Sequence, residues 1–217
     1  RADDFDRLFG GLKIGQNPTP LHNRYFILNL NFSVVDPKGD AEAIAASLHR
    51  HVNNAIEAFA VRYREVLKAP IECHPTDGLS SLGRLLTAIS MTPHKLYVLI
   101  DEYDNFANEV MISPLHGTDR YHELVQGEGT IKTFFKAVKA GAEGQGIDRV
   151  FLTGVSPVVL SDITSGYNVA EDLSADPDYY DLCGFTGHEL RAALEAVAAL
   201  HALSDVQVMT ALELMRD

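Results

Sequence analysis

The residues that most constrain the fold are those from Leu96 to Asp104, which read LYVLIDEYD. The five apolar residues from Leu96 to Ile100 include β-branched and aromatic types. A run of this kind is typical of a strand buried on both faces of a parallel sheet. Two carboxylates, Asp101 and Glu102, follow at once, and in open α/β sheets the carboxyl ends of the strands border the ligand-binding crevice. The pattern predicts a strand that carries two carboxylates to a ligand site. A buried strand that ends in a solvated acidic turn would also give these residues.

Further strands and amphipathic helices alternate with this strand along the chain. Apolar runs predict a strand over 25–32 before it and a strand over 149–155 after it. Apolar residues that recur every three or four positions predict helices before and after the central strand in the sequence. The expected helices cover 40–67, 80–90, 103–111 and 129–142, and a helical C-terminal portion begins at about residue 186, with a last helix over 204–216.

Helices between successive buried strands predict an α/β fold, a three-layer sandwich with a mainly parallel sheet. The chain has 217 residues, without an internal repeat or an obvious linker, so we expect one domain over residues 1–217. In such a sheet the strand ends share one edge. Asp101, Glu102, Thr153 and Ser156 should therefore converge, although they are distant in sequence.

Charge, cysteine content and hydropathy exclude several classes of protein. The formal net charge of −12 disfavours a broad nucleic-acid surface, which would need clustered Lys and Arg, so we find no strong support for direct nucleic-acid binding. Two cysteines, Cys73 and Cys183, are too few for a disulfide framework or a four-cysteine zinc site. Reduced thiols, with no apolar run near the ~20 residues of a membrane helix, favour a cytoplasmic protein with no membrane contact.

Four blocks of sequence resemble a known family. The blocks LYVLIDEYDNF, RVFLTGVSPVVLSDITSGYNVAEDLS and DPDYYDLCGFTGHEL resemble, in this order, the AAA-ATPase-like family of P-loop NTPases from bacteria and fungi. The earlier block FGGLKIGQNPTPLHNRYFILNLNFS resembles the region of the family's second strand. Members of this family often carry a PD-(D/E)XK nuclease-like domain further along the chain. The resemblance implies a P-loop NTPase core of the additional-strand type that binds ATP and Mg²⁺.

The resemblance also implies a role for each candidate site residue. Asp101 and Glu102 occupy the Walker B position: Asp101 would hold a water molecule on Mg²⁺, and Glu102 would polarise the attacking water. Thr153 occupies the sensor position and would hydrogen-bond near the γ-phosphate or that water. Ser156, three residues later, is a second candidate for contact with the cofactor.

One family element is missing from the sequence. The motif G-x-x-x-x-G-K-[ST], whose backbone N–H groups and Lys hold the nucleotide phosphates, does not occur. The segment from Gly10 to Lys13 is similar only in part, because no hydroxyl residue follows the Lys. We therefore expect an N-terminally truncated domain that lacks the Walker A region. Such a chain would be inactive alone and would bind neither ATP nor Mg²⁺ tightly, because protein and phosphates hold the metal jointly.

Other functions remain open on the sequence alone. A binding or regulatory module on a degenerate NTPase scaffold would keep the same strands, with the segment 156–185 as its recognition surface. The pattern Asp101-Glu102-x-Asp104 also occurs in helicases, although the net charge disfavours strand tracking. The sequence shows no nuclease motif. A sheet edge left open by truncation would favour a protein partner or self-association.

Overall fold

The computed structural model describes most of the chain, and two compact units emerge from its contacts. The described residues are 2–105, 108, 110, 129–155, 170–174, 176–179, 186–201 and 204–214. The units comprise residues 1–169 and 170–217, and each is described by itself. The expectation of a single domain stays a prediction.

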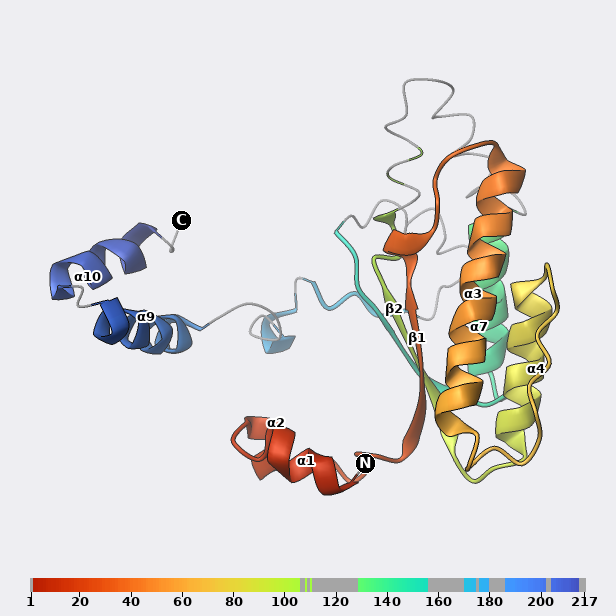
Figure 1. Cartoon of the computed structure of the whole chain (residues 1–217), viewed down its shortest axis with the longest axis horizontal. Coiled ribbons are helices and arrows are strands. Elements are labelled where there is room, and N and C mark those ends of the chain that lie inside the picture. The colour runs from red at the N-terminus through yellow and green to blue at the C-terminus, as the bar shows by residue number, and fades with distance from the viewer. Residues whose placement is uncertain are drawn as a thin grey trace. The chain divides into compact units, whose positions relative to one another are not determined.

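The first unit is built on a three-stranded parallel sheet (Figure 1). Its strands are β1 (Tyr25–Asn31), β2 (Lys95–Asp101) and β3 (Ile147–Leu152), and β2 lies in the middle. Both pairings are parallel. The apolar run that ends in two carboxylates therefore forms the central strand, which confirms the predicted α/β class and its parallel sheet.

The helices that contact the sheet are α3 (Ala41–Tyr63), α4 (Gly78–Ser90) and α7 (Thr130–Ala142). They form one layer on one face of the sheet (Figure 1). The reason is topological: the crossovers from β1 to β2 and from β2 to β3 step in the same direction. Parallel strands are joined by right-handed crossovers, and right-handed crossovers that run in the same direction across a sheet place their helices on the same face. These helices form one helical layer of an α/β sandwich.

Burial of side chains alternates along the strands, as expected for a sheet with this helical layer on one face. Phe26, Leu28 and Leu30 of β1 are at most 3% exposed and pack in the core beneath the helices. Residues between them, such as Ile27, are only partly buried. The same alternation in β2 buries Leu96, Val98 and Ile100. Side chains of a strand alternate between its two faces. Asp101 therefore lies on the less buried face of the sheet, which also carries Ile27.

Capping side chains fix where two of these helices begin. The Asp40 carboxylate accepts a hydrogen bond from Ala43 N–H at 2.8 Å at the start of α3. Asp77 caps α4 by accepting from Leu79 N–H and Ser80 N–H. Helix α4 therefore begins at Gly78, two residues before the predicted start.

Two element ends differ from the sequence prediction for local reasons. Helix α3 ends at Tyr63 rather than near Leu67, because the chain tightens there into turns in which Val66 N–H and Leu67 N–H both donate to the Tyr63 carbonyl. Strand β3 covers 147–152 rather than 149–155. Pairing starts earlier, after Gly146, whose carbonyl accepts from Leu96 N–H, and it ends where the chain turns away at Gly154.

The remaining elements are short or helical. The segment before β1 forms α1 (Ala2–Phe9) and α2 (Lys13–Gln16), and a 3-10 turn, η1 (Phe32–Val34), follows β1. Of the predicted helix over 103–111, residues 105, 108 and 110 are described as helical, and the other residues after 105 lie outside the described part. None of the helices in the described ranges is long and apolar enough to cross a membrane.

The second unit contains η2 (Pro177–Tyr179), α9 (Gly187–His201) and α10 (Asp205–Leu214). A capping box begins α9, because Thr186 N–H donates to Glu189 Oε2 and Glu189 N–H donates to Thr186 Oγ1. Ser204 and Gln207 make the same reciprocal pair before α10. Helices α9 and α10 pack against each other.

Candidate functional site

The candidate site lies where the three parallel strands end. Asn31 of β1 and Asp101 of β2 are register partners at the last position of their strands. Leu152 pairs with Ile100, so the next residue, Thr153, lies beside Asp101. Carboxyl ends of parallel strands border the ligand crevice in open α/β sheets. The structure therefore brings Asp101 and Thr153 together, as the sequence predicts.

Asp101 and Thr153 are in direct contact. The Thr153 hydroxyl donates a hydrogen bond to Asp101 Oδ1. Backbone bonds extend this contact beyond the strands: Thr153 N–H donates to the Ile100 carbonyl at 2.9 Å, and Tyr103 N–H donates to the Thr153 carbonyl at 3.1 Å. Asp101 is exposed, so its carboxylate lies open to an incoming ligand while the Thr153 hydroxyl orients it.

Glu102 has an unusual backbone. Its φ angle is +55°, in the left-handed region that residues with a side chain seldom adopt. Its carbonyl accepts Asn105 N–H at 3.0 Å, so the chain turns sharply into the helical residues that follow. Left-handed residues other than glycine cost of order 1 kcal/mol and concentrate at functional sites. The turn separates the half-exposed Glu102 from the line of β2.

Asp104, in contrast, is completely buried. Its Oδ1 accepts Val155 N–H at 3.3 Å, and its Oδ2 accepts from Asn108 Nδ2 at 2.9 Å. Sequence reasoning used Asp104 only as the last letter of an acidic motif and missed this contact across the sheet edge. The small residue Gly154 beside Val155 was the available signal, because a close approach of backbone often requires glycine.

Asn31, the last residue of β1, also lies at this edge. The Asn31 side chain accepts Ser33 N–H at 2.9 Å and so caps η1. Ser156, predicted to contact the cofactor, lies outside the described residues.

The donor set at this edge fits Mg²⁺ only as a shared site. Mg²⁺ prefers oxygen ligands and usually keeps several waters, with one or two protein carboxylates. Asp101 is an exposed carboxylate next to a hydroxyl, which suits that chemistry. Within the described ranges, no three His, Cys, Asp or Glu side chains form a group that could hold a metal ion. A cation here would therefore need further oxygen ligands from a bound molecule.

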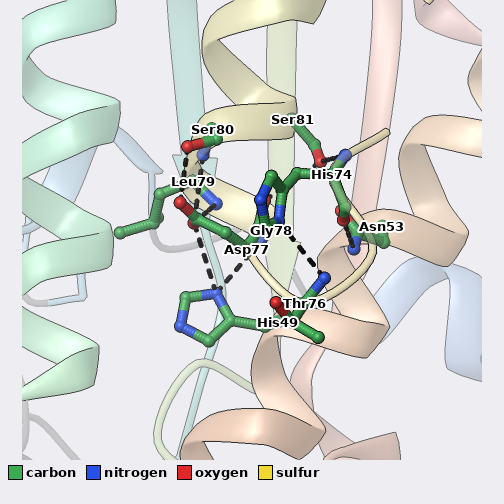
Figure 2. A network of polar contacts seen from close by, with 9 residues as sticks. All are labelled: His49, Asn53, His74, Thr76, Asp77, Gly78, Leu79, Ser80 and Ser81. Atoms are coloured by element: carbon green, nitrogen blue, oxygen red, sulfur yellow. Dashed lines mark hydrogen bonds and ion pairs between the residues drawn. The ribbon is translucent and has the colours of Figure 1, made fainter. Parts of the chain in front are cut away.

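A second polar cluster lies at the start of α4 (Figure 2). There His49 Nδ1 accepts Gly78 N–H at 3.1 Å, so this nitrogen carries no proton and its 3.9 Å approach to Asp77 is not an ion pair. The pKa of Asp77 is lowered, chiefly because the Ser80 hydroxyl donates to its carboxylate. Most other contacts in this cluster join a side chain to backbone, for example Asn53 Nδ2 to the His74 carbonyl at 2.7 Å. The cluster fastens the connection before α4 to α3, which is a structural task.

Comparison with known proteins gives one match. The model of a family described as Predicted AAA-ATPase matches residues 1–164. The chain belongs to the AAA-ATPase-like family. No curated protein and no solved structure matches it significantly. The match covers the whole sheet, so the edge formed by Asp101 and Thr153 belongs to the family's matched region.

Proposed function

We propose that this AAA-ATPase-like chain supplies the Walker B and sensor elements of a domain that binds and hydrolyses ATP. The observation that carries the proposal is the contact between the Thr153 hydroxyl and the exposed Asp101 carboxylate at the carboxyl edge of a parallel sheet. The last residue of β2 and the first residue after β3, 52 positions apart in sequence, meet where such sheets bind ligands. The family membership and the adjacent Glu102 support the same function.

The chain's own residues would divide the work in this way. Asp101 would hold Mg²⁺ through a water molecule, and Thr153 would orient that carboxylate and reach toward the γ-phosphate. Glu102 orients the attacking water and accepts its proton, for which its half-exposed position beyond β2 leaves room. Ser156 is a further candidate for contact with the nucleotide. Mg²⁺ bound with ATP supplies charge neutralisation at the phosphates.

ATP affinity depends on a phosphate-binding loop. The 217 residues contain no G-x-x-x-x-G-K-[ST] motif, so the backbone cradle and the phosphate Lys are not provided by that motif here. We therefore propose that this chain by itself binds Mg²⁺ and ATP weakly and turns over ATP poorly. We also propose a cytoplasmic location and association with a protein partner or a second copy.

The alternative is a binding or regulatory module without catalysis. A degenerate NTPase scaffold would keep its sheet, and the missing phosphate motif favours this reading. In that case Asp101 and Thr153 would serve only to shape the sheet edge.

Calorimetry with Mg²⁺ and ATP tests the proposal. It would be performed on this chain and on a longer chain that adds whatever residues the gene encodes before Arg1, each with Glu102→Gln and with Glu57→Gln as a matched control on an exposed face of α3. We expect tight binding in the longer chain only. Glu102→Gln should keep binding but lose hydrolysis by about 100-fold or more, as for loss of a general base.

Three results would contradict the proposal. No binding in either chain would favour the regulatory module. Tight binding by this chain alone would show that another loop holds the phosphates. Equal hydrolysis in Glu102→Gln and Glu57→Gln would remove Glu102 from the chemistry.

A further inference from the structure

Asp104 is the only one of three neighbouring carboxylates that is withdrawn completely from solvent. Asp101 is exposed and Glu102 is partly exposed, but Asp104 is 0% exposed. A buried carboxylate is costly unless hydrogen bonds replace its lost hydration. Its two oxygens accept from Val155 N–H and from Asn108 Nδ2.

The hydrogen bond from Val155 N–H joins two segments that are 51 residues apart in the chain. Asp104 belongs to the turn after β2, and Val155 belongs to the segment after β3. Gly154 lets the two segments meet: a Cβ at this position would lie 2.5 Å from Asp104 Oδ1 and 2.5 Å from Tyr103 Cε1. The contact is therefore tight, and it accepts no side chain at position 154.

Thr153 lies between the points where these segments are fastened. Its N–H is held by the Ile100 carbonyl, and its own carbonyl is held by Tyr103 N–H. Two residues later Val155 is held by Asp104. Because the backbone is held on both sides of Thr153, its hydroxyl is positioned to donate its hydrogen bond to the Asp101 carboxylate.

We propose that Asp104 is a positioning residue that fastens the segment after β3 to the turn after β2 and so holds Thr153 against Asp101. The inference rests on the proposed function in one respect: it takes Asp101 and Thr153 to be the pair that serves the nucleotide. Asp104 itself is buried and does not touch the ligand.

Hydrogen exchange of single backbone amides tests the positioning directly, on this chain and without a ligand. Asp104→Leu roughly keeps the size of the side chain but removes both acceptor oxygens, so Val155 N–H and Asn108 Nδ2 both lose their acceptor. We expect the Val155 amide to exchange at least about tenfold faster relative to the Leu96 amide, which is bonded to the Gly146 carbonyl in the sheet.

A double variant separates positioning from general loss of stability. In Asp104→Asn combined with Asn108→Asp, the new amide at position 104 donates to the new carboxylate at position 108 and keeps its oxygen for Val155. The exchange ratio should return to within about threefold of its original value. The matched control is Ser81→Ala, which removes a buried hydroxyl that accepts His74 N–H at 2.8 Å and should leave the ratio unchanged.

An unchanged ratio in Asp104→Leu, or a ratio in the double variant outside this threefold range, would overturn the proposal. A second measurement asks whether the positioning matters for chemistry. In the chain form that hydrolyses Mg²⁺–ATP, Asp104→Leu should lower kcat at least about tenfold with KM changed less than about threefold, and the double variant should keep kcat near its original value. Faster exchange with unchanged kcat would make Asp104 merely structural.

The two measurements fail separately. If no form of the unaltered protein binds or hydrolyses ATP, the proposed function is wrong, and the exchange ratio still decides whether Asp104 holds Thr153.

Discussion

At the scale of single residues, three carboxylates within four positions have three different environments. Asp101 is exposed and accepts from Thr153, Glu102 sits on a left-handed backbone, and Asp104 is buried against the segment after β3. The sequence alone gives three similar side chains. Their different surroundings suit different tasks. Asp101 is placed to bind a ligand, Glu102 is held in a fixed orientation beyond the end of β2, and Asp104 stabilises the local structure.

The backbone of Glu102 leads to the first prediction. Glycine adopts a φ of +55° without the steric cost that alanine bears there. We expect Glu102→Gly to be more stable than Glu102→Ala by about 1 kcal/mol, because both variants lose the carboxylate and only alanine keeps the strain. Urea denaturation monitored by circular dichroism measures the difference.

The control for Glu102 is Glu57, which is exposed in the interior of α3. There the order should reverse, with Glu57→Gly less stable than Glu57→Ala by about 1 kcal/mol, because glycine is a poor helix former. Equal stability of the two Glu102 variants would mean that this turn relaxes and that no strain is stored at the site.

At the scale of elements, two helical glycines are predicted to respond oppositely to alanine. A Cβ at Gly83 of α4 would meet nothing within 4 Å, whereas a Cβ at Gly141 of α7 would lie 2.5 Å from Ile147 Cδ1 and 3.1 Å from Leu86 Cδ1. Gly83→Ala should raise the free energy of unfolding by about 0.5–1 kcal/mol. Gly141→Ala should lower it by about 1 kcal/mol or more, because Ile147 is buried and has to move.

Thermal and urea unfolding of both glycine variants would check the contrast. A gain in stability for Gly141→Ala would show that α7 can shift away from β3, and that the helix layer is packed less tightly than these distances imply.

The cap of α4 gives a prediction about pH. The pKa of Asp77 is lowered in the folded protein, chiefly by the hydrogen bond from Ser80. A carboxyl group whose pKa is lower in the folded than in the unfolded chain stabilises the fold above its unfolded pKa of about 3.9, and this contribution is lost as pH falls through the folded pKa. The stability difference between the unaltered protein and Asp77→Asn should therefore be full at about pH 6 and shrink below about pH 4.

Asparagine caps helices about as well as aspartate, so this comparison isolates the charge. Urea unfolding at several pH values measures it. Repeating the comparison in a Ser80→Ala background should reduce the difference, because the largest cause of the lowered pKa is then absent. A difference that is independent of pH would contradict this account of the cap.

At the scale of the whole molecule, the sequence predicts those contacts of the candidate site that follow from the order and direction of the strands. Asp101 and Thr153 could be brought together from sequence because strand ends in a parallel sheet share an edge. The contact of Asp104 with Val155 could not, because it depends on a turn at Glu102 and on the closeness that Gly154 allows. Such contacts follow from three-dimensional packing rather than from periodicity along the chain.

The ends of helices and strands are likewise hard to predict from the sequence. Apolar runs located β1, β2 and α7 well, but β3 ends before the apolar residue Val155, which is 85% exposed although its N–H is held by Asp104. Hydropathy predicts that such a residue continues the strand. Its actual place is decided by a hydrogen bond to a residue 51 positions earlier.

The central position of β2 has a consequence for how the chain folds. In the described sheet the strands pair with partners far away in sequence, for example Tyr25 with Lys95 and Leu96 with Ile147. During synthesis β1 leaves the ribosome about 70 residues before its partner exists, and closing loops of this length is slow. Helix α3 is the next long element after β1, separated from it by η1 and a short connection, and it contacts β1. We expect α3 to shield the apolar face of β1 during that wait, and the sheet to assemble only when β2 arrives.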